Sequence, residues 1–383
     1  MIPADHLPDA AFQPLIPAYG TGSLADLMPS VSAMLGVPGA DDTLGLRERL
    51  DGVDRVAVLL VDGLGSYQMP LMAPHAPGLT SLAARTLTSG FPSTTPVSLV
   101  TLGTGVAPGR HGVLGFMARL PDGRILNHIR WDDDPPPALW QPVPTCFETA
   151  AAAGVAVTQV TRPEFEGTGL TVSAYRGAAF TGASDLESLA NGMLGALRAG
   201  PGMVFGYHPD LDKHGHNSGV GSPAWEEAAR DVERLVEMLV DGLPPSAALL
   251  ITADHGQLNV PSSARFDVSD LAGVVAFTGE PRVRYLHVLP GAEDDVVAAA
   301  RSMFGSSARV LTRAEAIDTG LYGPVTPANA ERIGDVVIIC LDRVVALATA
   351  VEPPMISRMV AYHGSVTAAE MTVPLLSVVG AAS

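Results

Sequence analysis

The chain has few positive charges, and this scarcity limits what it can bind. Its 383 residues include 23 lysines and arginines against 40 aspartates and glutamates, and Lys213 is the sole lysine. A formal net charge of −17 argues against binding to nucleic-acid polymers or to anionic membranes, because both require basic surfaces. It would also repel an anionic substrate, unless a bound cation reverses the sign of the charge locally.

Cysteines and long apolar runs are lacking as well. Cys146 and Cys340 are too few for a disulfide framework, so a reducing compartment is expected. No uninterrupted apolar run reaches the length that spans a bilayer, and residues 1–20 show no secretory signal. We therefore expect a cytoplasmic protein without a membrane segment, and a homodimer is compatible with this sequence.

Aliphatic residues, in contrast, are abundant and form short runs typical of buried strands. Hydrophobic residues make up 47% of the chain, which implies a large core. Helical patterns alternate with these runs, which predicts an α/β fold, an α/β/α sandwich around a largely parallel sheet. The runs that we predict as strands of this sheet are 53–61, 154–160, 203–207 and 247–252.

One region departs from this alternation. Residues 266–333 predict an inserted α+β subdomain, which could cap the site, within a single catalytic domain that spans residues 1–383. A strand over 334–341 then resumes the hydrophobic strand pattern. Residues 116–131 predict a hairpin, because apolar and polar residues alternate around the turn signal Pro121-Asp122-Gly123.

Residues 91–98 predict a loop that leads into a helix. Pro96 suits the first helical position, since its φ is fixed and its missing N–H is not needed there, and this makes Thr95 the N-cap. The Thr95 hydroxyl would then lie at the positive end of the helix dipole, which stabilises an alkoxide or a phosphoryl group. Alone, the pattern is more typical of an ordinary threonine cap.

Acids and histidines are predicted in loops just after the predicted strands, or in short loops that contain glycine. Open α/β sheets bind small molecules and ions at the carboxyl ends of their parallel strands, so these residues are candidate metal ligands. A single aspartate at such a position also fits a tight turn. Mixed aspartate and histidine ligands suit Zn²⁺ better than Mg²⁺. Six ligands and a hydroxyl are too many for one tetrahedral ion but suit two ions that clamp a phosphoryl transfer. The candidates are Asp62, Asp212, His216, Asp254, His255 and His363.

Taken in order, the motifs resemble the alkaline phosphatase superfamily, in its nucleotide pyrophosphatase/phosphodiesterase branch. The resemblance covers about residues 55–380. It implies two zinc ions, and a nucleophile, Thr95, that attacks phosphorus and carries a covalent phosphoryl or nucleotidyl group. One zinc would be surrounded by Asp62, Thr95, Asp254 and His255, and the other held by Asp212, His216 and His363. The motifs are Asp62-Gly-Leu-Gly65, Phe91-Pro-Ser-Thr-Thr95, Gly103-Thr-Gly105 with His111-Gly112, Asp212-x-x-Gly-His216, Asp254-His255-Gly256 and His363-Gly364.

Two choices of register remain open in these motifs. Thr94 could be the nucleophile, but the capping argument and the spacing after Phe91 favour Thr95. Asp210 precedes His214 by four residues, just as Asp212 precedes His216. We prefer the second pair because only His216 follows a glycine, with a second glycine three residues later.

The chain departs from this branch at one position. Members that cleave nucleotides place an asparagine after the His-Gly segment, where it contacts a phosphate oxygen, and this chain has Phe116 there. Phe116 could stack on a base or aryl group, or pack in the core. Arg282 and Arg284 could reach a second phosphate or a carboxylate, or be solvated strand residues.

The resemblance and the residues together predict a two-zinc phosphodiesterase or nucleotide pyrophosphatase that acts on a small-molecule phosphate ester or nucleotide. A phosphomonoesterase is an alternative, but it needs cationic groups for the additional phosphate charge, and the site motifs contain few. A phosphonate hydrolase could use the same scaffold. A non-catalytic protein that binds a phosphorylated ligand would not need a nucleophile within a complete ligand set.

Overall fold

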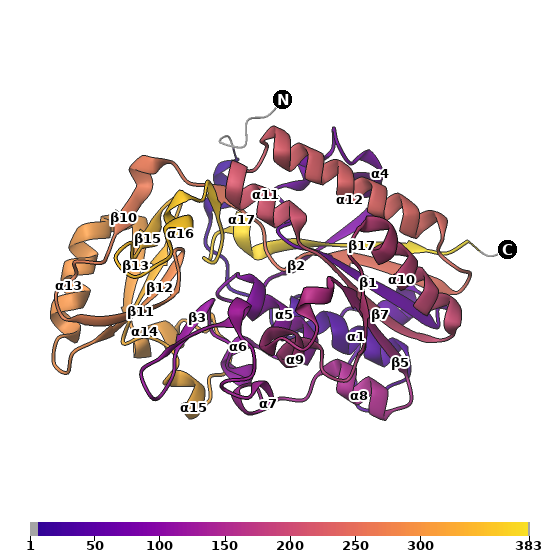
Figure 1. Ribbon diagram of the computed structural model, residues 1–383, viewed down its shortest axis with the longest axis horizontal. Coiled ribbons are helices and arrows are strands. Elements are labelled where there is room, and N and C mark those ends of the chain that lie inside the picture. Colours follow the sequence, from indigo (N-terminus) through magenta and orange to yellow (C-terminus); the bar gives the residue numbers. More distant parts are fainter. Residues whose placement is uncertain (1–6, 382–383) are drawn as a thin grey trace.

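A seven-stranded sheet forms the centre of the molecule in the computed structural model, which describes residues 7–381 (Figure 1). The strands β8, β1, β7, β5 and β6 run parallel, and β17 is antiparallel to its two neighbours. The predicted α/β fold with a largely parallel sheet is confirmed. In spatial order the strands are β2 (Ala83–Thr88), β17 (Thr372–Val379), β8 (Ala247–Thr252), β1 (Arg55–Val61), β7 (Gly202–His208), β5 (Ala156–Thr161) and β6 (Ala179–Gly182).

Helices cover both faces of this sheet, which explains why its inner strands are aliphatic along their whole length (Figure 1). The six residues 56–61 of β1 are fully buried. One face is covered by α10 (Leu186–Ala199) and α12 (Pro223–Asp241), and Ser222 caps α12 by accepting a hydrogen bond from the Trp225 N–H. The other face carries α1 (Leu27–Met34), α5 (Thr95–Thr104), α8 (Cys146–Ala152) and α9 (Gly169–Tyr175).

A second, six-stranded sheet lies beside the first, at the left of Figure 1. The predicted hairpin is present as β3 and β4. The strand predicted over 334–341 is present as β14, but it pairs with β12 and β13 rather than with the central sheet. The boundary of the insertion at 266–333 stays a prediction. In spatial order the strands are β13 (Ala308–Thr312), β14 (Val336–Cys340), β12 (Val283–Val288), β11 (Val274–Glu280), β3 (Met117–Arg119) and β4 (Ile125–Asn127).

Two small two-stranded sheets pair segments that are far apart in the sequence. The strand β9 (Leu258–Asn259) pairs with β16 (Ala361–Tyr362), and β10 (Arg265–Asp267) pairs with β15 (Val345–Leu347). The first of these sheets places His363 beside the segment that follows His255. Within residues 7–381, no helix is long and apolar enough to cross a bilayer. The remaining α-helices are α2 (Leu46–Arg49), α3 (Met69–Met72), α4 (Pro77–Ser81), α6 (Pro108–His111), α7 (Pro137–Trp140), α11 (Asp210–Ser218), α13 (Glu293–Phe304), α14 (Arg313–Asp318), α15 (Pro327–Ala330), α16 (Pro354–Arg358) and α17 (Ala368–Met371).

Candidate active site

Three neighbouring parallel strands bring the candidate ligands together. In the central sheet β1 lies between β8 and β7, with Leu60 opposite Thr252 and Val61 opposite His208. The segments that follow these three strands therefore emerge at one edge of the sheet. Asp62 follows β1, residues 254 and 255 follow β8, and α11 follows β7. This is the edge where parallel α/β sheets bind their ligands.

The first group of ligands, here called the Asp62 cluster, consists of Asp62, Asp254 and His255. The Nε2 atom of His255 lies 3.1 Å from Oδ2 of Asp254 and 3.5 Å from Oδ1 of Asp62. All three side chains are buried. Among the described residues, neither of these two carboxylate oxygens has a hydrogen-bond partner. Buried, unpartnered carboxylate oxygens around one imidazole nitrogen suit a cation.

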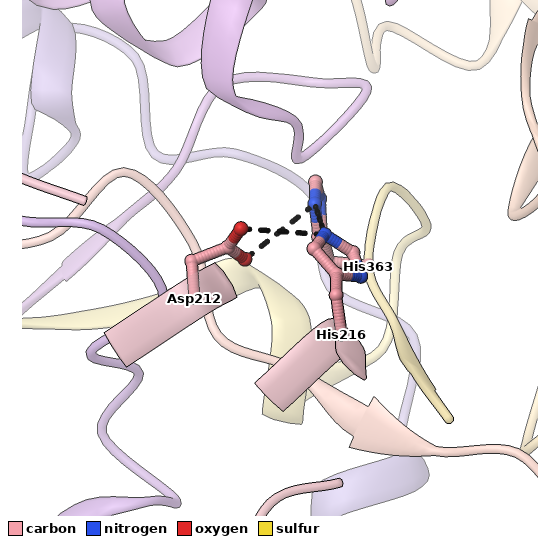
Figure 2. Close-up of side chains that lie close together, drawn as sticks. All are labelled: Asp212, His216 and His363. Atoms are coloured by element: carbon pink, nitrogen blue, oxygen red, sulfur yellow. Dashed lines mark hydrogen bonds and ion pairs between the residues drawn. The ribbon is translucent and has the colours of Figure 1, made fainter. Parts of the chain in front are cut away.

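The second group, the Asp212 cluster, consists of Asp212, His216 and His363 (Figure 2). The Nε2 atom of His216 lies 3.3 Å from Oδ2 of Asp212 and 3.1 Å from Nε2 of His363. The sequence predicted Asp212 and His216 in a loop, and this is wrong, because both lie on α11. Residues four apart share one face of a helix, which is why both side chains point to His363.

Both histidines of the Asp212 cluster are held in one tautomer by backbone carbonyls. Nδ1 of His216 donates to the Ala361 carbonyl at 2.8 Å, and Nδ1 of His363 donates to the Ser93 carbonyl at 3.0 Å. When both rings are neutral, each Nε2 carries a lone pair, and two lone pairs 3.1 Å apart cannot bond to each other. A cation that accepts both lone pairs resolves this conflict, so the residues present fit a metal ion.

Electrostatics lead to the same conclusion. Burial, together with the carboxylates of Asp254 and Asp212, raises the pKa of Asp62 well above its usual value. Burial, with His255 and His216 nearby, lowers the pKa of His363 well below its usual value. The rings of His255 and His363 stack with centroids 3.5 Å apart, so the two clusters adjoin. Asp62 and Asp254 are buried and Asp212 is half-buried, and three carboxylates this close together need positive charge nearby to be stable in the ionised form.

The Thr95 hydroxyl lies next to the Asp62 cluster. Its Oγ1 is 3.2 Å from Nε2 of His255, whereas the Thr94 hydroxyl is buried and makes no hydrogen bond within residues 7–381. The predicted cap is off by one residue, because Thr94 is the N-cap and Thr95 is the first residue of α5. Thr94 has the extended backbone of a cap, with φ of −135° and ψ of 150°, but its side chain bonds to no helix N–H.

The alternative pair in the second motif has other partners. The guanidinium of Arg162 donates to both carboxylate oxygens of Asp210 at 2.6 Å, so Asp210 belongs to an ion pair outside both clusters. His214 is half-buried and belongs to neither cluster. Of the two alternatives, the structure brings Asp212 and His216 to the site.

A small pocket opens beside Thr95. Its volume is about 100 Å³, and its walls include the aromatic rings of Phe165, Tyr175 and Tyr207 and the aliphatic Leu99. Within residues 7–381, no lysine or arginine is among its lining residues. The pocket therefore suits an uncharged aromatic or apolar group bonded to a phosphoryl group at Thr95.

The two residues predicted to contact substrate, Phe116 and Arg282, lie outside the pocket beside Thr95. Phe116 is half-buried and does not line the pocket beside Thr95. Arg282 is fully buried, and its guanidinium binds both carboxylate oxygens of Glu370, at 2.6 and 2.9 Å. Its charge is already matched in the interior, which argues against the predicted contact with substrate, and that contact stays a prediction. Arg284 is likewise buried and pairs with Glu352 at 2.6 Å.

Two orienting residues were missed by sequence reasoning. The Tyr207 hydroxyl donates to Oδ2 of Asp62, and the Gln257 amide donates to Oδ1 of Asp212. Gln257 directly follows the Asp254-His255-Gly256 motif, and that adjacency was a usable signal. Tyr207 gave no signal, because its partner lies 145 residues away in the chain. Gly215 makes room for Gln257, since a Cβ there would lie 1.8 Å from the Gln257 Oε1.

A largely parallel sheet with two adjoining aspartate–histidine clusters and a hydroxyl at its carboxyl edge defines a metal-dependent phosphohydrolase of the alkaline phosphatase superfamily. Residues 56–365 match the type I phosphodiesterase / nucleotide pyrophosphatase family, and the chain belongs to this family of phosphoric ester hydrolases. None of the curated proteins compared with the chain matches it.

Solved structures share the fold. Human ectonucleotide pyrophosphatase/phosphodiesterase 5 is 16% identical, with a TM-score of 0.64 over 85% of this chain and 88% of that one. Its murine counterpart, in an inactive threonine-to-alanine variant bound to AMP, is 16% identical, with a TM-score of 0.64 over 84% and 87%. Phosphonoacetate hydrolase from Sinorhizobium meliloti, in complex with phosphonoformate, is 19% identical, with a TM-score of 0.64 over 85% and 89%. At these identities the likeness concerns the fold.

Proposed function

We propose that the protein hydrolyses phosphodiesters or nucleotide pyrophosphate bonds through a covalent phosphothreonine on Thr95. The observation that carries this proposal is the position of the Thr95 hydroxyl, 3.2 Å from His255 in the Asp62 cluster and in the wall of the adjoining pocket. The Thr95 hydroxyl thus lies next to both the candidate metal ligands and the pocket that could hold a substrate. The murine relative that is inactive once a threonine is replaced by alanine supports this role.

Two divalent cations, which we propose to be Zn²⁺, complete the site. Asp62, Thr95, Asp254 and His255 would hold one ion, and Asp212, His216 and His363 the other. When bound, such cations lower the pKa of a ligated hydroxyl and stabilise charge on a leaving oxygen. The mixed aspartate and imidazole donors favour zinc over magnesium.

The reaction then has two displacements at phosphorus. In the first, Oγ1 of Thr95 loses its proton to solvent and bonds to phosphorus, and the ester oxygen leaves and takes up a proton. In the second, water bonds to phosphorus and loses a proton to solvent, while the bond from phosphorus to Oγ1 breaks and Oγ1 takes up a proton, which restores the Thr95 hydroxyl. Tyr207 and Gln257 keep Asp62 and Asp212 in place throughout. Two in-line displacements give net retention of configuration at phosphorus.

The surroundings favour a monoanionic diester over a dianionic monoester. The pocket beside Thr95 has aromatic walls and, in the described part of the chain, no cationic lining residue, and the nearby Arg162 and Arg282 are paired with Asp210 and Glu370. An aryl group or a nucleobase fits such walls, as the AMP complex of the murine relative also suggests. A phosphonate that carries a carboxylate would find no cationic partner in this pocket.

The test compares bis(p-nitrophenyl) phosphate with p-nitrophenyl phosphate on zinc-loaded protein. We expect faster cleavage of the diester, and loss of this activity after chelation and in Thr95→Ala. Thr21→Ala, at an exposed threonine far from the motifs in sequence, controls for the substitution itself. Faster cleavage of the monoester, or full activity of Thr95→Ala, would overturn the proposal.

A further inference from the structure

Glu280 is a buried acid beside the active site that belongs to neither metal-ligand cluster. It is the last residue of β11 in the second sheet, and only 4% of it is exposed. Neither of its carboxyl oxygens has a hydrogen-bond partner within residues 7–381. Burying a carboxyl group without a partner costs free energy, so a role is expected for one that persists here.

Polar and charged groups of the active-site loops and of the second sheet act on this carboxyl group. Burial raises the pKa of Glu280 to about 8, and the Thr94 hydroxyl, Arg284, the Phe116 N–H and His255 each lower it by a smaller amount. The Thr94 hydroxyl is itself buried and has no partner among the described residues. Each of these two groups therefore offers the other the hydrogen bond that it lacks.

The loop that carries His363 packs against Glu280 as well. Gly364 has φ of +130°, and a Cβ built there would lie 2.8 Å from Cγ of Glu280. Gly364 accepts a hydrogen bond from the Ser93 N–H at 2.9 Å, while the Ser93 carbonyl accepts one from His363 at 3.0 Å. Glu280 thus lies where the loop before Thr95 meets the loop after His363.

We propose that Glu280 is a positioning residue, whose carboxyl group hydrogen-bonds to the Thr94 hydroxyl and fixes the loop that presents Thr95. Thr94 directly precedes Thr95, so the orientation of its side chain sets the approach of the Thr95 hydroxyl to His255. A nucleophile displaced by about 1 Å loses rate steeply, on the order of 100-fold. Through β11, the second sheet thereby contributes to catalysis. The catalytic part of this inference rests on the proposed function.

The test uses Glu280→Leu, which removes the hydrogen bond, and Glu280→Gln, which keeps it. In Glu280→Leu we expect kcat for the aryl diester to fall about 10- to 100-fold with KM nearly unchanged, and Glu280→Gln to recover most of this loss. Thr94→Val should add little to Glu280→Leu, because the two residues act through one bond. Additive effects of the two substitutions would overturn the inference.

A second measurement does not depend on turnover. Hydrogen exchange of the amides in residues 93–98, measured on metal-free protein, should be faster in Glu280→Leu than in the wild type. Thr278→Val is the matched control, because Thr278 is a buried residue of the same strand that bonds to His287 at 3.0 Å. It should leave both exchange and kcat unchanged.

The two proposals can fail separately. Unchanged kcat and unchanged exchange in Glu280→Leu, with an active wild type, would overturn the role of Glu280 alone. A wild type without turnover would overturn the proposed function, and exchange in residues 93–98 would then decide the positioning role by itself.

Discussion

Replacing Arg282 by methionine should destabilise the protein rather than weaken substrate binding. Arg282 and Glu370 are both fully buried, and their two hydrogen bonds measure 2.6 and 2.9 Å. Methionine fills similar space but leaves the Glu370 charge without its partner. Glu370 also accepts the Ser365 N–H at 3.0 Å, so its displacement would disturb the loop that holds His363.

The size of the effect follows from this burial. Removing one member of a buried ion pair costs about 3–5 kcal/mol, because an uncompensated charge remains in the interior. The entropy of unfolding is about 2.1 cal/mol/K per residue, which for 383 residues gives about 0.8 kcal/mol/K. The Tm of Arg282→Met should therefore fall by about 4–6 °C. The double variant Arg282→Met/Glu370→Gln, in which the remaining acid is replaced by a neutral amide, should regain part of the lost Tm.

Calorimetry and steady-state kinetics on the same preparations provide the assay. Arg284→Met is the matched comparison for stability, because Arg284 and Glu352 form a buried pair of the same kind at 2.6 Å. Both variants should unfold at lower temperature than the wild type. If Arg282→Met unfolds within about 1 °C of the wild type while KM for the diester rises, the arginine contacts substrate and our reasoning is wrong.

Three further predictions concern the site. Thr95→Ala should lower diester turnover at least about 1,000-fold, while Thr95→Ser keeps a measurable rate. If Thr95→Ala and the wild type cleave the diester at equal rates in rapid-mixing assays, threonine is not the nucleophile. Phe165→Ala should raise KM for an aryl diester about 10-fold but hardly affect a small alkyl diester, and equal effects on both would argue against an aryl pocket. Because folding raises the pKa of Glu280 from 4.5 to about 8, its contribution to stability is full below pH 4.5 and is lost as pH rises to about 8. The free energy of unfolding of the metal-free wild type should thus fall across this range by up to about 5 kcal/mol relative to Glu280→Gln, and parallel pH curves in chemical denaturation would refute it.

The central strands could be predicted because burial on both faces leaves a plain signal. β1 is aliphatic over nearly its whole length, and the sequence locates it within two residues. A run of aliphatic residues does not indicate which sheet the strand joins. The aliphatic run in β14 resembles that in β1, yet β14 pairs with β12 and β13, since the choice depends on contacts far apart in sequence.

The candidate ligands could be predicted because they follow strands directly, but their local structure could not. α11 has Leu211 and Gly215 as its only buried residues, so it lacks the apolar periodicity that marks a helix in the sequence. The sequence also could not predict the contact of Tyr207 with Asp62 or the lack of a partner at Glu280, since each depends on tertiary proximity. The order β8, β1, β7, which places the ligands together, is likewise a property of the folded sheet.

The pairing of the arginines gives the scarcity of positive charge a structural meaning. The cationic side chains that could have met a phosphoryl group are bound to carboxylates, Arg162 to Asp210 and Arg282 to Glu370. Near Thr95, the described part of the chain therefore offers a phosphate little positive charge of its own. Cations held by the Asp62 and Asp212 clusters would have to supply it, and two divalent ions compensate a monoanionic diester more completely than a dianionic monoester. The preference for diesters that we propose thus rests on how the arginines are paired.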